Sequence, residues 1–199
     1  MTSRIVCIAG GSGAGKTTLA EGLALSLGDR AALLSLDEYQ KSKYEVPRAP
    51  NGRPNYDHPD AVDWPRFLAD VAVLRGGSDI RLRQKRKHSS MDGGVLPAAI
   101  VTISSRPLII VEGYLALWHP EARALYDLAV FLDGSAELRL ARRRWAKDPQ
   151  YVAEVLLPMH LLYVEPTKAY ADLVIDVATS TKEAVLESAL AALAARGFI

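Results

Sequence analysis

The sequence predicts a three-layer α/β domain with a five-stranded parallel sheet. Short apolar runs without polar alternation recur along the chain, which is typical of parallel strands buried on both faces. Stretches with helical spacing of leucine and alanine separate these runs, as in folds whose helices cover both faces of a sheet. Polar residues directly follow four of the runs. Because the carboxyl ends of parallel strands share one edge, that edge is the expected ligand site.

The first apolar run, Arg4–Ala9, leads into a motif that predicts the ligand. Residues 10–18 read GGSGAGKTT and fit G-x-x-x-x-G-K-[ST], a phosphate-binding loop. Glycines let successive N–H groups point at one anion, and the following helix adds its positive end. Lys16 supplies a cation for the β- and γ-phosphates, and Thr17 supplies a hydroxyl for Mg²⁺. The residues expected to bind the nucleotide are Gly10, Gly11, Ser12, Gly13, Ala14, Gly15, Lys16, Thr17 and Thr18.

The remaining elements complete a P-loop nucleoside triphosphate hydrolase fold. Further apolar runs predict strands at Ala31–Leu36, Arg106–Val111, Leu128–Leu132 and Leu173–Asp176. Helical spacing predicts helices at Lys16–Leu27, from Asp60 or Asp63 to about Leu74, and at His119–Tyr126, Ser135–Ala146, Tyr151–Tyr170 and Thr181–Arg196. Pro158 is expected to bend or split the helix that contains it. No linker or repeat interrupts the pattern, so residues 1–199 are expected to form a single domain.

Two segments do not fit the strand–helix alternation. Residues 41–59 are polar and rich in proline, and a loop of this length inside a compact domain is usually functional. Residues 79–105 predict a small β-hairpin insertion, with strands at Ile80–Arg83 and Ile100–Ile103. The basic run Arg83–His88 in this hairpin has three interpretations: a charged edge that discourages pairing, a site for an anionic acceptor, or a contact to nucleic acid.

Composition excludes several classes of function. The net charge is only +1, which argues against nucleic acid as a partner. No apolar run approaches the roughly 18–20 residues of a membrane span, and the sequence shows no signal peptide or transit segment. One cysteine, Cys7, rules out an internal disulfide. We therefore expect a cytoplasmic protein without membrane contact, and the sequence leaves a homo-oligomer open.

Acidic residues at the strand ends are candidates for metal binding and proton transfer. Glu112 follows the third strand, where a carboxylate that assists Mg²⁺ binding is expected, and Asp37 follows the second. Asp37 is also a candidate general base for a hydroxyl acceptor. Their alternatives are a helix N-cap for Asp37 and a solvated loop acid for Glu112. Asp133 ends the fourth strand and is interpreted as a cap for the next helix, and Asp57 is interpreted either as a ligand for a cis-diol or as a turn residue.

The chain resembles the uridine kinase and phosphoribulokinase family of P-loop kinases, and uridine kinases most closely. The resemblance rests on five blocks: GGSGAGKTT at 10–18, LDEY at 36–39, NYDHPDAVD at 55–63, IVEGYLAL at 110–117 and PMHLLYVEPTKAYADLVID at 158–176. RLARR at 139–143 is a weaker sixth block. A P-loop alone is shared by many families, whereas the NYDHPDAVD block and the EPTKAYAD part of the fifth block are far more specific to this one.

The resemblance implies a role for each matching residue. Asp37 matches the catalytic base near Mg²⁺, and Glu112 matches the metal-linked acid. Asp57 matches the aspartate that holds the ribose hydroxyls of a nucleoside, and Arg143 matches a lid arginine that contacts phosphates. Aromatic or imidazole groups near the acceptor are implied at three further positions, which are Tyr39, Tyr56 and His88.

The chain departs from the family at two places. The hairpin carries Arg83 and Gln84 where uridine kinases carry a tyrosine–aspartate pair, so Arg83 is a candidate acceptor contact of altered chemistry. The lid, at about 142–150, is short and lacks the arginine–glycine–arginine element of uridine kinases. The cations that remain to neutralise a transferred phosphoryl group are Arg142, Arg143, Arg144 and Lys147.

These observations predict an enzyme, an ATP-dependent phosphotransferase that uses Mg²⁺. Its expected acceptor is the 5′-hydroxyl of uridine or cytidine, with Lys16, Asp37 and Arg143 as catalytic residues. A guanine-reading N-K-x-D signature is absent from the sequence, which favours ATP over GTP. The alternatives are a kinase of another small acceptor (a sugar, sugar phosphate, vitamin or organic acid), an ATPase switch without a small acceptor, and a catalytically silent relative with a shortened lid.

Overall fold

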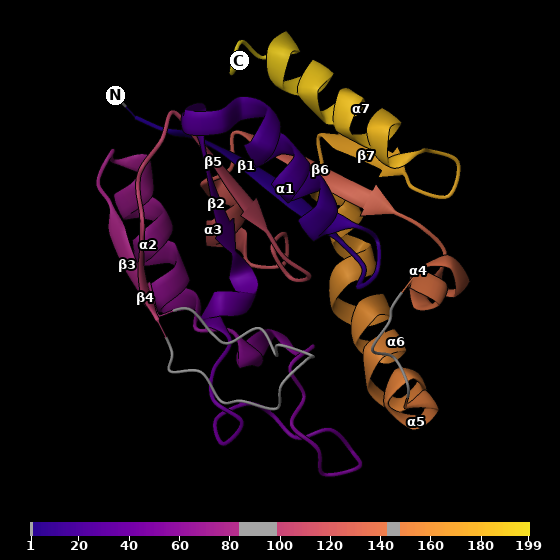
Figure 1. Cartoon of the computed structure of the whole chain (residues 1–199). Coiled ribbons are helices and arrows are strands. Elements are labelled where there is room, and N and C mark those ends of the chain that lie inside the picture. Colours follow the sequence, from indigo (N-terminus) through magenta and orange to yellow (C-terminus); the bar gives the residue numbers. More distant parts are fainter. Residues whose placement is uncertain (1, 84–98, 143–147) are drawn as a thin grey trace.

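The computed structural model describes residues 2–83, 99–142 and 148–199 (Figure 1). Its centre is a five-stranded parallel sheet with the strand order β2-β5-β1-β6-β7. The strands are β1 (Arg4–Gly10), β2 (Ala31–Ser35), β5 (Leu108–Glu112), β6 (Leu128–Asp133) and β7 (Leu173–Asp176). Every residue of β5 is buried, because a central parallel strand is covered on both faces. The five strands expected from the apolar runs are therefore confirmed.

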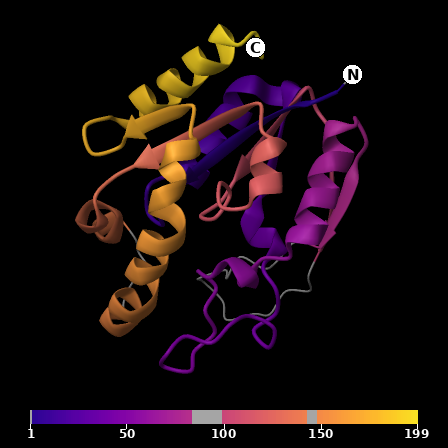
Figure 2. The same ribbon diagram turned by 180° about the vertical axis from the view of Figure 1, so that it is seen from behind.

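Helices cover both faces of the sheet and complete three layers (Figures 1 and 2). On one face, α1 (Lys16–Leu27) and α7 (Lys182–Ala195) enclose an apolar cluster that includes Leu23 and Val130. On the other face, α2 (Trp64–Arg75) and α3 (Pro120–Ala124) enclose a second cluster around Phe67 and Phe131. Within the described residues, no helix is both long enough and apolar enough to cross a membrane.

A long irregular helix runs from residue 149 to residue 170. It contains α5 (Pro149–Tyr151) and α6 (Leu157–Met159), with π-helical turns at Val152–Leu156 and His160–Val164 and a 3₁₀ segment at Glu165–Tyr170. Figure 2 shows the ribbon continuing through these segments. Pro158 lies in α6 between the two π-helical turns, so it makes the helix irregular and does not split it. The shorter α4 (Ala136–Arg142) precedes residues 143–147.

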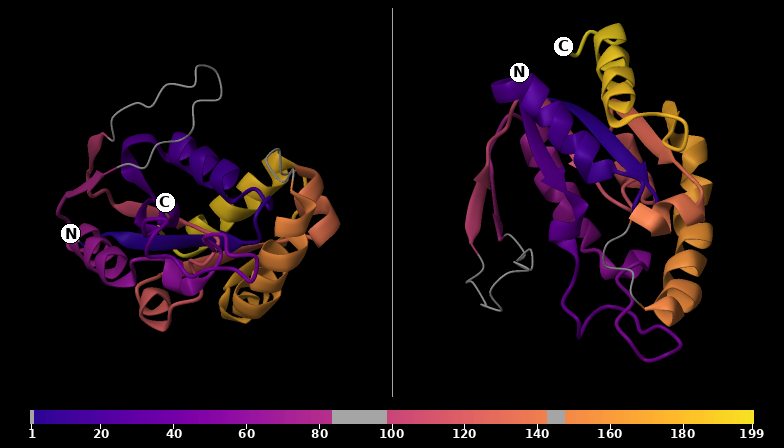
Figure 3. Two further views of the ribbon diagram at one scale, coloured as in Figure 1. Left: turned by 90° about the horizontal axis from the view of Figure 1, so that it is seen from below. Right: turned by 45° about the vertical axis from the view of Figure 1, so that its right-hand side comes forward.

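The hairpin insertion is present beside the main sheet. β3 (Ile80–Arg83) pairs antiparallel with β4 (Ile100–Ile103), and Figure 3 shows this pair next to α2. Ile80 and Leu82 are buried, whereas Arg81 and Arg83 are exposed. Residues 84–98 between the two strands, and therefore most of the basic run, lie outside the described residues.

The parallel sheet brings the predicted polar sites to one edge. Glu112, the last residue of β5, is in register with Ser35 at the end of β2 and with Ile8 of β1. The phosphate-binding loop follows β1, and Asp133 ends β6. The expected ligand edge, where four strands end on polar residues, is therefore a property of the fold.

The fold corrects the expectation that Tyr39 lies near an acceptor. Its side chain is 2% exposed, packs edge-on against Phe67 at 5.2 Å between ring centroids, and donates a hydrogen bond to Asp70 Oδ2 at 2.8 Å. Tyr39 therefore belongs to the core, because the 3₁₀ turn Leu36–Tyr39 directs it toward α2 and away from the sheet edge.

Tyr39→Phe is predicted to lower the free energy of unfolding by about 1–2 kcal/mol, since it removes a part-buried hydrogen bond to a carboxylate. Tyr44→Phe, at a residue that is 79% exposed, is the matched control and is expected to change stability by less than about 0.5 kcal/mol. Denaturant unfolding measures both. A Tyr39→Phe variant with full stability and weakened acceptor binding would return Tyr39 to the site.

Candidate active site

The phosphate-binding loop connects β1 to α1 in a conformation that requires glycine. Gly10, Gly13 and Gly15 have φ angles of 138°, 86° and 99°, in the region that side-chain-bearing residues rarely adopt. A Cβ on Gly13 would also lie 2.2 Å from the carbonyl oxygen of Arg139. Lys16 extends from the start of α1, and its Nζ donates to the carbonyl of Gly11 at 3.1 Å. The loop and Lys16 therefore form the anion-binding end expected from the motif.

Arg139 supports this loop from behind, a role that the sequence did not indicate. The side chain is 3% exposed, and its Nε donates to the carbonyl of Gly134 at 3.0 Å. A Cβ on Gly11 would lie 2.3 Å from Arg139 Nη1, so the guanidinium packs against the loop backbone. Burial lowers the pKa of Arg139 from its ordinary value. The only available signal was the weak block RLARR, which identifies basic residues and not which of them is buried.

Glu112 is a buried carboxylate between the ends of β2 and β1. It is 5% exposed, and Ser35 Oγ donates to its Oε1 at 2.6 Å. Thr17 Oγ1 lies 3.4 Å from its Oε2. Burial raises the pKa of Glu112, while the hydrogen bond from Ser35 and the charge of Lys16 oppose that shift. This geometry argues against the alternative of a solvated loop acid.

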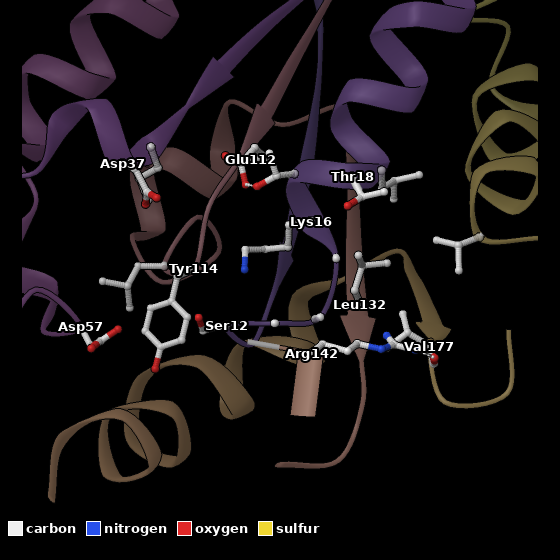
Figure 4. Close-up of a pocket in the computed structure, with 18 of the residues that line it drawn as sticks. Ser12, Lys16, Thr18, Asp37, Asp57, Glu112, Tyr114, Leu132, Arg142 and Val177 are labelled. Atoms are coloured by element: carbon white, nitrogen blue, oxygen red, sulfur yellow. Dashed lines mark hydrogen bonds between the residues drawn. The ribbon is translucent and has the colours of Figure 1, made fainter. Parts of the chain in front are cut away.

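Asp37 is the second residue of the 3₁₀ turn that follows β2, and its backbone N–H lies 3.4 Å from Ser35 Oγ. Its carboxylate lines the pocket (Figure 4). The negative charge of Asp37 contributes to the raised pKa of Glu112, so the two carboxylates interact electrostatically. Ser35, rather than Asp37, accepts the N–H at the start of this turn, which disfavours the N-cap alternative.

The oxygen donors of this edge fit Mg²⁺. Thr17, Glu112 and Asp37 offer a hydroxyl and two carboxylates beside the phosphate-binding loop. Residues 2–83, 99–142 and 148–199 contain no group of three or more His, Cys, Asp or Glu side chains arranged to hold a metal alone. Mg²⁺ usually takes one or two carboxylates and fills its other positions with phosphates and water.

A cavity of about 1340 Å³ extends from the phosphate-binding loop in two directions. Figure 4 shows Asp37 and Asp57 on one side of Lys16, and Arg142 and Val177 on the other. Pockets for one drug-sized ligand usually measure about 300–1,000 Å³. The cavity is therefore larger than a pocket for a single ligand of that kind.

The acceptor loop, which we define as residues 41–63, contributes the end of the cavity that contains Tyr56 and Asp57. The N–H of Asp57 donates to Asn55 Oδ1 at 3.1 Å, and Tyr151 of α5 donates to its Oδ2. His58 lies behind it, with Nδ1 accepting from the N–H of Asp60 at 3.1 Å and Nε2 lying 3.2 Å from Tyr163 Oη. These contacts give His58 a structural role in the loop.

The opposite end of the cavity includes Arg142, one of the lid cations named from the sequence, together with residues that follow β7. Arg142 lines it and donates from Nη2 to the carbonyl of Val177 at 3.0 Å. The loop between β7 and α7 adds Ser180, Thr181 and Lys182. Thr181 also caps α7, accepting from the N–H of Ala184 at 3.2 Å. Ser180, Thr181 and Lys182 reach the cavity because β7, which precedes them, pairs with β6.

Other predicted positions lie elsewhere. Arg83 is exposed on β3 and is not among the described residues that line the cavity. The interpretation of Asp133 as a helix cap is wrong: Asp133 pairs with Lys168, and Ser135 Oγ accepts the N–H of Leu138 at 3.3 Å instead. Two predicted contacts, Arg143 and His88, lie outside the described residues.

The fold and this edge define the class of protein: a P-loop kinase of the three-layer α/β type. The chain belongs to the phosphoribulokinase / uridine kinase family, whose model matches residues 5–184. A uridine kinase from Deinococcus deserti is 33% identical over 186 residues, covering 86% of each chain. One from Chloroflexus aggregans is 34% identical over 208 residues, covering 92% of this chain and 96% of the relative.

Solved structures resemble the fold. A structure described as a possible uridine kinase from Bacillus stearothermophilus has a TM-score of 0.59 at 22% identity, covering 88% of this chain and 90% of the other. A shikimate kinase from Acinetobacter baumannii, in complex with shikimate, has a TM-score of 0.54 at 16% identity, covering 98% and 95%. The same architecture therefore occurs in kinases named for different acceptors, and the acceptor has to be argued from the site.

Glu112→Gln tests the buried carboxylate. Because the folded state raises the pKa of Glu112, it binds that proton more tightly than the unfolded chain does. Wild-type stability should therefore fall as pH rises from the ordinary carboxyl pKa to the raised one, and Glu112→Gln should lack this fall. Mg²⁺-dependent activity should decrease about 10–100-fold, as for other groups that orient a metal site.

Thermal unfolding at a series of pH values gives the stability readout for Glu112→Gln. Glu121→Gln, at an exposed position on α3, is the matched control and should retain the wild-type pH dependence. Parallel pH profiles for wild type and Glu112→Gln would contradict the assigned environment of Glu112.

Proposed function

We propose that the protein transfers the γ-phosphoryl group of ATP to the 5′-hydroxyl of uridine or cytidine with the aid of Mg²⁺. The observation that carries this proposal is one cavity whose lining contains both the phosphate-binding loop and Asp57. The family supports phosphoryl transfer as the reaction class. Curated relatives named uridine kinase, at 32–34% identity, support the choice of acceptor.

The donor half of the proposed site holds the triphosphate. The loop N–H groups and Lys16 would bind the β- and γ-phosphates, and Arg142 would lie beside the nucleoside end of ATP. Thr17 and Glu112 would hold Mg²⁺, which when bound neutralises phosphate charge and fixes the phosphate geometry. Arg143, outside the described residues, stays a proposed lid contact to the transferred group.

The acceptor half would orient and activate the hydroxyl. Asp57 would accept hydrogen bonds from the two ribose hydroxyls, which directs the 5′-oxygen toward Lys16 and the γ-phosphate. The 5′-oxygen then forms a bond to the γ-phosphorus as the bond from that phosphorus to the ADP oxygen breaks. The hydroxyl proton goes to Asp37, which lies in the turn after β2, the strand whose last residue is in register with Glu112.

Charge at the acceptor end favours a neutral acceptor over a sugar phosphate or an organic acid. The described lining there includes the carboxylates of Asp37, Asp57 and Asp148, and its cation Arg53 is paired with Asp148. An anionic acceptor would meet like charges, which disfavours its binding. Arg83, the candidate contact for an anion, lies away from the described lining. Asp57 shares the cavity with the phosphate-binding loop, which also argues against an ATPase switch, because a switch needs no side chain that binds a diol.

Asp37→Asn is predicted to reduce kcat by about 10²–10⁴-fold, since it removes the proposed proton acceptor. ATP binding should persist, because the loop and Lys16 are unchanged. Glu38→Gln, the neighbouring carboxylate on the same turn, is the matched control and should retain activity. Steady-state kinetics with a separate nucleotide-binding assay distinguish the two; turnover by Asp37→Asn at the wild-type rate would overturn the assignment.

The acceptor is tested by ADP release from Mg²⁺–ATP in the presence of nucleosides, sugars, sugar phosphates and organic acids. Uridine or cytidine should accelerate release, and the anionic compounds should not. Acceleration by a sugar phosphate alone would replace the nucleoside with an anionic acceptor. Turnover that no compound accelerates would favour the ATPase switch.

A further inference from the structure

The acceptor loop is fastened to the helix at 149–170 by a row of side-chain contacts. Asp57 accepts from Tyr151, Arg53 pairs with Asp148, and Asn51 donates to Glu154 at 3.1 Å. His58 and Tyr163 approach within 3.2 Å further along the same helix. Figure 3 shows this loop and the start of the helix meeting at the same end of the molecule.

Tyr151 is one of the members of this row that line the substrate cavity. Tyr151 and Asp57 both line the cavity, whereas Tyr163 and His58 are not part of its described lining. Asp148 caps α5 by accepting the N–H groups of Gln150 and Tyr151, at 3.0 and 3.2 Å, which fixes the backbone that carries the phenol. The tyrosine therefore reaches Asp57 from a fixed helix start.

We propose that Tyr151 is a positioning residue that orients the Asp57 carboxylate toward the hydroxyls of the acceptor. This inference rests on the proposed function and assigns a role to a residue that no motif identified. The N–H of Asp57 is fixed by Asn55, and Tyr151 binds Oδ2, so backbone and carboxylate are both held. A carboxylate accepts about four hydrogen bonds, so Asp57 can bind the phenol and a pair of hydroxyls together.

The energetic consequence concerns the acceptor and not ATP. A carboxylate whose orientation is set before binding loses less conformational freedom when the acceptor arrives. Removing the phenolic hydroxyl should therefore weaken acceptor binding while the donor half is unaffected. The effect should depend on the hydroxyls that Asp57 accepts, because Tyr151 acts through Asp57.

The test compares Tyr151→Phe with Tyr163→Phe, since each removes one hydroxyl from the same helix. Tyr151→Phe should raise the KM for uridine about tenfold, which corresponds to one charge-assisted hydrogen bond. Its kcat and its KM for ATP should stay within about twofold of wild type. Tyr163→Phe should leave all three parameters near wild type, because its partner His58 is outside the described lining.

Two further measurements separate positioning from a loss of structure. With 2′-deoxyuridine, Tyr151→Phe should cost less than with uridine, since one hydroxyl of the diol is missing. In an Asp57→Ala background, Tyr151→Phe should cost nothing further. Equal effects on both nucleosides, an added cost in the Asp57→Ala background, or a parallel fall in kcat and rise in the KM for ATP would overturn the role of Tyr151.

Failure of the proposed function gives a different result. If wild type neither binds nor phosphorylates uridine and cytidine, the acceptor assignment and the positioning role fall together. If wild type phosphorylates uridine and Tyr151→Phe matches Tyr163→Phe, the acceptor assignment stands and only the inference about Tyr151 is overturned.

Discussion

The site depends on a carboxylate buried where three elements of the fold meet. Glu112 ends β5, the strand between β2 and β1, and it contacts Ser35 at the end of β2 and Thr17 in the first turn of α1. Burial opposes its charge, and Ser35 and Lys16 only partly offset that cost. A buried carboxylate whose desolvation is only partly offset contributes little to the stability of the protein without ligand. Its placement is consistent with a site organised for a cation and a triphosphate rather than for stability alone.

The two proposed halves of the site differ in how far apart their residues lie in the sequence. The donor half is local: β1, a glycine loop and α1 follow one another in the chain, and the buried Arg139 supports the loop. The acceptor half is non-local, because Asp57 and Tyr151 are 94 positions apart and meet only when the acceptor loop packs on the helix at 149–170. Binding of the proposed acceptor therefore depends on that packing.

This difference explains how far the sequence predicts the structure. Apolar strands and the loop motif are local patterns, so the sheet, the three layers, the hairpin strands and the position of Glu112 could all be predicted. Tyr39 is expected at the site because it lies two residues after Asp37 in the same motif. The turn, however, directs the Asp37 side chain into the cavity and the Tyr39 side chain against Phe67. Asp133 was misassigned because its partner, Lys168, is distant in sequence. Arg139 and Tyr151 were missed for the same reason.

The central claim is that one cavity joins a phosphoryl donor to a hydroxyl acceptor. Product identification by phosphorus NMR and mass spectrometry, after incubation with Mg²⁺–ATP and uridine, tests it most directly. The expected products are equal amounts of ADP and a uridine monophosphate that carries the phosphate on the 5′-oxygen. ADP with inorganic phosphate and unmodified uridine would contradict it, because hydrolysis without transfer has no use for an acceptor half.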